Sequence, residues 1–150
     1  GTAIEPSMPG AAHSAANPLT AHFDVIHGQA VGMMLPHVVR FNAADETIAD
    51  GYATLVKDTA VASSNGTLSA EALAQAMEAL LDSANLPRAL AQCGVEEAQL
   101  ETLSGEAAQQ WTASFNPRPV SGQDFAKLYA SLFAGTACAE IAFEASSSKA

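Results

Sequence analysis

Apolar residues recur every three or four positions along most of the chain, which is the spacing of helices that bury one face. Breaks rich in Gly, Pro and Ser interrupt this pattern, so it predicts several helices rather than one long one. A segment over 95–111 predicts one or two helices. The core positions that the pattern predicts are Val31, Met34, Leu35 and Val38; Ile48, Tyr52, Leu55 and Val56; Leu73, Met77, Leu80 and Leu81; Leu100, Leu103 and Trp111; and Phe125, Leu128, Tyr129, Leu132 and Phe133.

The first helix is predicted over residues 8–23, a run of small residues with Asn17-Pro18 in its middle. Proline lacks the backbone N–H that a helix interior uses, so this segment is either a kinked helix or one that restarts at an Asn17 cap. We favour the kinked helix. A link over 24–28 leads into the second helix, which is expected to bend near Pro36 and to bury Met33 and Met34.

Side chains that satisfy free backbone groups mark further helix ends. Ser69 is a typical N-cap, with Leu68 and Leu73 spaced as a hydrophobic staple. Ser121 and Asp124 have the spacing of a capping box at the start of the last helix. The remaining breaks are expected at Ser63-Ser64-Asn65-Gly66, after a helix over 44–61; around a short helical turn from Leu86-Pro87 to Gly94; and in the loop Asn116-Pro117-Arg118-Pro119.

Composition supports a helical fold. The 150 residues include 33 alanines and only 9 aromatic residues. Alanine has the highest helix propensity, whereas sheets are rich in branched and aromatic side chains. We therefore predict an all-α, multi-helix bundle. The length fits one domain, placed at residues 1–133, because the small residues after Gly135 bury little and predict a weakly ordered tail over 134–150.

Charge and cysteine content exclude some classes of partner and site. The formal net charge of −10 would repel a phosphate backbone or an anionic membrane surface, so neither nucleic acid nor membrane is an expected partner. We find no signal sequence and no apolar run long enough to cross a bilayer. Cys93 and Cys138 are too few and too far apart for a metal knuckle or a disulfide framework, so two inert thiols and a reducing, cytoplasmic location are expected.

All four histidines lie within the first 37 residues. Histidine is the commonest protein ligand for divalent metals, and His13 and His27 lie on either side of the link between the first two predicted helices. The two rings are therefore placed to converge on a metal ion. The spacing alone is explained better by capping or surface histidines, so both interpretations stay open at this point.

A longer motif surrounds these histidines. His13 opens a small-residue segment, His27-Gly28 follows fourteen residues later, and the next helix ends in Leu35-Pro36-His37-Val38-Val39-Arg40-Phe41-Asn42. This stretch closely resembles the metal-site signature of the iron-containing (group III) alcohol dehydrogenases. Leu86-Pro87 and Asn116-Pro117-Arg118 fit the same pattern, so the resemblance covers about residues 1–133.

The resemblance implies the helical, dehydroquinate synthase-like C-terminal half of a two-domain, NAD(P)-dependent enzyme that interconverts small alcohols and aldehydes. It implies that His13 and His27 bind one Fe²⁺ or Zn²⁺ together with an Asp and a His from earlier helices, for which this sequence has no counterpart. No GGGS or GxGxxG phosphate-binding loop occurs in the 150 residues. We therefore expect a chain that lacks the cofactor-binding half and is inactive alone.

The resemblance also implies roles for residues near the metal. Many family members carry a further His one helical turn after the first ligand, where this chain has Asn17, which can hydrogen-bond a substrate but cannot carry a proton. Phe23 is a candidate for the lining of the substrate pocket, or else a core aromatic. Structural roles are preferred for His22 at a helix end, Asp24 as a cap of the following turn rather than a substitute metal ligand, His37, and Arg118 as an anchor for a carbonyl or carboxylate.

Two alternatives stay open. A helical half without its nucleotide-binding partner would expose apolar surface, which predicts a homodimer or a stand-alone module that binds another protein. Within the family, the glycerol dehydrogenases, maleylacetate reductases and dehydroquinate synthases share the two-domain plan. The motif over 27–42 looks most like the alcohol dehydrogenase branch.

Overall fold

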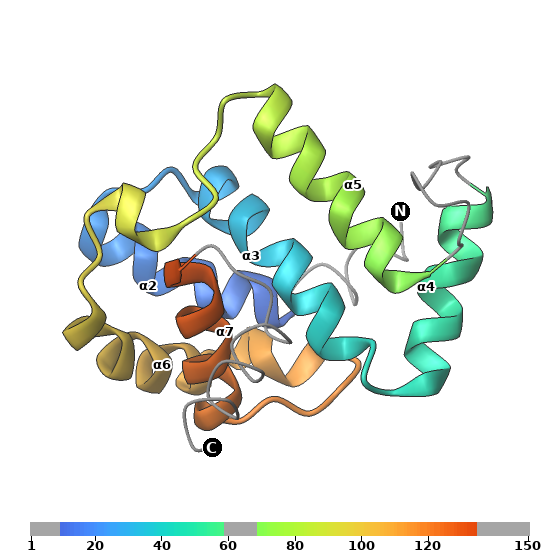
Figure 1. Ribbon diagram of the computed structural model, residues 1–150. Helices are drawn as coiled ribbons and strands as arrows, with labels where there is room; N and C mark the ends of the chain where they lie inside the picture. The colour runs from blue at the N-terminus through green and yellow to red at the C-terminus, as the bar shows by residue number, and fades with distance from the viewer. Residues whose placement is uncertain (1–9, 59–68, 135–150) are drawn as a thin grey trace, which may run out of the picture.

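The structure is a computed structural model that describes residues 10–58 and 69–134. All the regular elements of these residues are helices (Figure 1), which confirms the all-α prediction. The α-helices are α2 (Ala11–Phe23), α3 (His27–Asn42), α4 (Glu46–Asp58), α5 (Ala70–Ser83), α6 (Leu100–Gln109) and α7 (Gly122–Ala134); the 3₁₀ helices are η1 (Leu90–Cys93), η2 (Glu97–Gln99) and η3 (Trp111–Phe115). Within the described ranges, no helix is long and apolar enough to cross a membrane.

Helix α2 runs through Pro18 without interruption. The continuity of the favoured helix is therefore confirmed and the alternative of a restart at Asn17 is wrong, while the kink stays a prediction; residues 8 and 9 of the predicted helix lie outside the described residues. Pro18 removes one backbone donor from the helix. Its ring is buried and packs in the interior, which offsets part of this loss.

The link between α2 and α3 is shorter than predicted. Asp24 ends α2 in a left-handed backbone conformation (φ 53°), which Asp adopts more readily than most residues because its short side chain bonds locally. The prediction that Asp24 caps the following turn is therefore wrong. α3 begins at His27 instead of after Gly28, and the residue before it, Ile26, makes no side-chain capping bond.

The other predicted caps are present where the structure describes them. The Ser69 hydroxyl accepts a hydrogen bond from the Ala72 amide at 3.2 Å. The Asp124 carboxylate accepts from the amide and the hydroxyl of Ser121, at 2.9 and 2.8 Å. Gly94 closes η1 at a φ of +82°, although this turn begins at Leu90, later than predicted. Leu68, residues 59–61 at the end of the predicted 44–61 helix, Ser63-Ser64-Asn65-Gly66 and the predicted tail after Ala134 lie outside the described residues.

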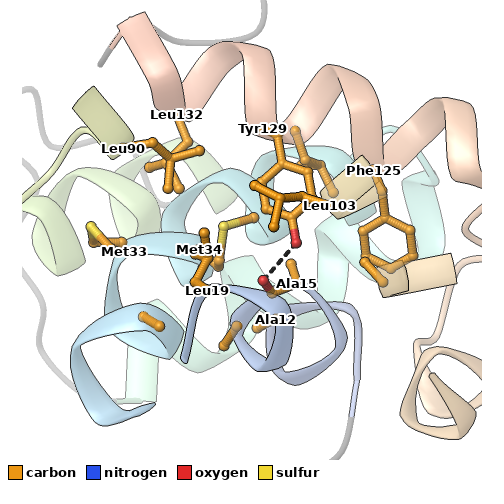
Figure 2. Close-up of a cluster of buried hydrophobic side chains, with 14 of the residues drawn as sticks. Ala12, Ala15, Leu19, Met33, Met34, Leu90, Leu103, Phe125, Tyr129 and Leu132 are labelled. Carbon is orange, nitrogen blue, oxygen red and sulfur yellow. Dashed lines mark hydrogen bonds between the residues drawn. The ribbon is translucent and has the colours of Figure 1, made fainter. Parts of the chain in front are cut away.

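The main core lies between α2, α3, α6 and α7, and Figure 2 shows its centre. Met33 and Met34 are buried there, as predicted, and face the apolar stripe of α7. The Tyr129 hydroxyl donates to the carbonyl of Ala15 at 2.6 Å, so the first and last described helices are joined inside the core. Large buried side chains of this cluster are Leu19, Met33, Met34, Leu90, Leu103, Phe125, Leu128, Tyr129 and Leu132.

Four predicted core residues are exposed instead: Leu35, Leu55, Leu80 and Trp111. Leu35, Leu55 and Leu80 each precede a buried residue, and a step of one residue turns a helix by about 100°, away from the side that the next residue buries. Trp111 follows the end of α6, and it starts a 3₁₀ helix in which the α-helical spacing no longer applies.

A second, smaller core forms where α4 and α5 pack at the C-terminal half of α3. Its buried members are Val39, Val56, Ala70, Ala72, Leu73 and Ala74. Arg40 of α3 ties this region to α5, because its guanidinium donates to both Glu71 and Glu78. These hydrogen bonds raise the pKa of Arg40, first of all the bond to Glu71.

The two motifs that lie far apart in the sequence meet at the end of α3. The side-chain amides of Asn42 and Asn116 bond to each other in both directions, at 2.7 and 3.3 Å. Arg118 donates to the Phe41 carbonyl at 2.6 Å, and its guanidinium lies 4.1 Å from the centre of the Phe41 ring. The predicted anchoring role of Arg118 is therefore confirmed.

Candidate metal centre

The imidazole rings of His13 and His27 face each other across the junction of α2 and α3. His13 lies in the first turn of α2 and His27 is the first residue of α3. Their ring centres are 5.5 Å apart, with the ring planes inclined by 52°. The structure thus brings together the two histidines that the sequence singles out.

This separation suits one ion held by both rings. A metal bound to an imidazole nitrogen lies about 2.0–2.1 Å from that atom and about 3 Å from the ring centre. Two imidazoles on a tetrahedral ion therefore have their centres about 5 Å apart. Among the described residues, however, no group of three or more His, Cys, Asp and Glu side chains is placed to hold a metal, so this geometry supplies two ligands.

The surroundings favour the neutral form of His13. Burial lowers its pKa, and the nearby His27 ring lowers it further because two positive charges would repel each other. His13 is half-buried, whereas His27 is exposed to solvent. A neutral imidazole is the form that binds a metal, so the protein does little to oppose ligation at His13 near neutral pH.

Asn17 and Phe23, the other two candidate site residues, have different surroundings. Asn17 lies one turn after His13 on α2, and its amide donates to the Gln110 side chain at 3.1 Å. Phe23 is half-buried, packs against the main core, and meets the His22 ring edge-on at 6.4 Å between ring centres. Its position therefore fits a core aromatic.

The remaining polar candidates have structural partners. The His22 ring lies 2.8 Å from the Glu106 carboxylate at the surface. His37 is buried and bonds the Ser131 hydroxyl at 3.0 Å, as its predicted structural role requires. Burial raises the pKa of the Cys93 thiol, which keeps it protonated and unreactive, in line with the prediction; Cys138 lies outside the described residues.

Sequence reasoning missed the residues that hold α2 in place around His13. The hydroxyls of Ser14 and Thr112 lie 2.6 Å apart in the interior, and Gln110 bonds to Asn17 one turn further on. These contacts join residues more than 90 positions apart, so no local spacing reveals them. The nearest available signal is a serine among the alanines of the first turns of α2.

The comparisons with known proteins identify the family. The model of the Fe-containing alcohol dehydrogenase family, C-terminal, matches residues 1–133. The chain belongs to this family. The resemblance that the sequence motifs indicate over about residues 1–133 is thereby confirmed.

Relatives within the family include a 1,3-propanediol dehydrogenase of Klebsiella pneumoniae, 30% identical over 135 residues, which are 89% of this chain and 34% of the relative. An NADPH-dependent butanol dehydrogenase of Clostridium saccharobutylicum is 25% identical over 140 residues, 91% of this chain and 36% of the relative. The crystal structure of a 1,3-propanediol oxidoreductase superposes with a TM-score of 0.72 at 27% identity, and covers 83% of this chain and 32% of that one. The chain thus spans about a third of the length of these relatives.

Proposed function

We propose that this chain forms the helical, metal-binding part of an NAD(P)-linked alcohol dehydrogenase that interconverts a small alcohol and its aldehyde. His13 and His27 would supply two imidazole ligands to Fe²⁺ or Zn²⁺. The observation that carries the proposal is the 5.5 Å approach of the two rings at the positions of the family motif. The remaining ligands and the NAD(P) site would come from outside these 150 residues.

The bound ion would act as a Lewis acid that lowers the pKa of the alcohol oxygen. The chain's own residues would prepare this site. His13 would offer a neutral ring, because its burial and the neighbouring His27 both oppose protonation. Asn17 would present an amide one helical turn away, which can hydrogen-bond a substrate oxygen but cannot relay a proton.

Metal binding to the purified chain tests this proposal. Zn²⁺ and Fe²⁺ would be titrated by equilibrium dialysis with elemental analysis of both compartments. We expect one ion per chain, bound weakly because only two ligands are present, and no specific binding by the His13→Ala, His27→Ala double variant.

The matched control is His22→Ala, which removes an exposed imidazole from the same helix without touching the pair. This variant is expected to bind the metal as the unchanged chain does. No metal uptake by the unchanged chain, or equal uptake by the double variant, would refute the proposal.

The proposal also predicts that the 150-residue chain alone does not reduce aldehydes. Its sequence has no glycine-rich loop to hold the pyrophosphate of NAD(P). Butyraldehyde and lactaldehyde, with NADH or NADPH at 340 nm, are suitable assay substrates. Turnover that survives in the double histidine variant would point to a contaminant, whereas turnover that disappears with it would overturn the prediction.

A protein-binding role is the second candidate, and one surface feature favours it. Trp111 is 69% exposed, and its ring meets that of Phe115 edge-on at 5.5 Å. Exposed aromatic pairs are typical of surfaces that contact another chain. Light scattering is expected to show a homodimer that Trp111→Ser converts to monomer, with protection of Trp111 from iodide quenching in the dimer. A monomer with fully quenchable Trp111 would argue against self-association.

A further inference from the structure

The first two turns of α2 are fastened to the segment just before α7 by polar side chains. The amide of Ala11 donates to Asn116 at 3.5 Å, the Ser14 and Thr112 hydroxyls pair at 2.6 Å, and Asn17 donates to Gln110 at 3.1 Å. His13 lies inside this fastened stretch, with a contact on each side of it along the helix. The partners all come from residues 110–116, a part of the chain that carries none of the candidate ligands.

The hydroxyl pair is the shortest and the most deeply buried of these contacts. Ser14 is fully buried and Thr112 almost so, and an unpaired hydroxyl in such a place would cost free energy. The pair therefore fixes both the depth and the rotation of α2 next to His13. By contrast, the turn that carries His27 starts at Ile26 without a side-chain cap and is open to solvent.

We propose that Thr112 and Gln110 are positioning residues for His13, holding α2 so that this ring meets His27 at the separation a shared metal ion needs. The inference rests on the proposed function of the histidine pair. Groups that orient a metal ligand without touching the metal typically change its affinity by about 10- to 100-fold. Here the effect would pass through the helix backbone, because Ser14 is the next residue after His13 and Asn17 lies one turn on.

Substitutions at Thr112 test the idea. Thr112→Val keeps the shape of the side chain and removes the hydroxyl, whereas Thr112→Ser keeps the hydroxyl. With Zn²⁺ alone as the probe, calorimetric titration of the 150-residue chain should show affinity about 10-fold weaker for Thr112→Val and nearly unchanged for Thr112→Ser. Gln110→Ala, at a partly exposed position where folding is less at risk, should weaken Zn²⁺ binding in the same direction.

Ser131→Ala is the control for a general loss of stability. It also removes a buried hydroxyl with a long-range partner, His37, but from a contact between α3 and α7. This variant should unfold at a lower temperature yet bind Zn²⁺ as the unchanged chain does. Equal loss of affinity in Ser131→Ala and Thr112→Val, or no loss in Thr112→Val, would overturn the positioning role.

A measurement without metal separates this inference from the proposed function. In the metal-free chain, nuclear Overhauser effects between the ring protons of His13 and His27 should be detectable, and they should weaken in Thr112→Val while Thr112→Ser retains them. If the unchanged chain binds no Zn²⁺ but the ring contact depends on Thr112, the proposed function fails and the positioning stands. If the ring contact is the same in all variants, the positioning inference fails.

Discussion

His37 makes the stability of the fold depend on pH in a direction that the structure fixes. Its side chain is 5% exposed between α3 and α7, where it bonds the Ser131 hydroxyl. Burial lowers its pKa to about 4, and the positive charges of Arg40 and Arg88 act in the same direction, while the Glu78 carboxylate opposes them. The His37 ring is therefore harder to protonate in the folded protein than in the unfolded chain.

The size of the effect follows from the two pKa values. An unfolded histidine takes up its proton near pH 6.5, but folded His37 does so only near pH 4. Its contribution is fully present above pH 6.5 and is lost as the pH falls from 6.5 to 4, because in this range only the unfolded state binds the proton. At about 1.4 kcal/mol per pH unit, the loss amounts to about 3 kcal/mol.

The variant His37→Asn isolates this contribution from those of the carboxylates. The asparagine amide has both a donor and an acceptor, so it can replace the bond of His37 to the Ser131 hydroxyl in either direction without titrating. The variant leaves a small cavity whose cost does not change with pH. Urea unfolding followed by circular dichroism would give the free energy of unfolding of both proteins at each pH.

We expect the stability advantage of the unchanged protein over His37→Asn to shrink by about 3 kcal/mol between pH 7.5 and pH 4. Arg40, Arg88 and Glu78 are present in both proteins, so their own titration largely cancels in the difference. A difference that stays constant within about 1 kcal/mol over this range would refute the reasoning, because it would mean that folded His37 accepts a proton as easily as the unfolded residue does.

Two further substitutions test contacts that define the bundle. Tyr129→Phe should lower the free energy of unfolding by about 1–1.5 kcal/mol, because it deletes the buried bond to the Ala15 carbonyl; a urea midpoint unchanged from that of the parent chain would contradict this. Ser69→Ala should cost about 1 kcal/mol by removing the cap on the Ala72 amide, and Ser69→Asp should restore most of it; thermal unfolding of the three proteins would show whether the cap matters.

Local chemistry explains what the sequence predicts well. Ser69, Ser121 with Asp124, and Gly94 are each recognised from a few neighbouring residues, and each ends or begins a helix as predicted. The approach of His13 and His27 also follows from a short stretch of chain, since only the link between α2 and α3 separates their helices. Such features depend little on the rest of the fold.

The errors arise where the decisive partner is distant or the helix type changes. Leu80 fits the helical spacing of the apolar residues in α5, but it lies outside the face of α5 that packs against α3 and α4. A buried Trp111 is expected only if the α-helical period continues past the end of α6, where the structure has a 3₁₀ helix instead. The pairing of Ser14 with Thr112 was not predictable, because both positions carry common small polar residues 98 positions apart.

The division of the buried side chains into two clusters has a consequence for local unfolding. The larger cluster joins the two ends of the described chain, while the smaller one holds α4 and α5 against the far half of α3. Proteins open in cooperative units that follow such clusters. We therefore expect helices α4 and α5 to detach and exchange their amide protons at a lower free energy than the rest, in a local opening that leaves His13 and His27 side by side.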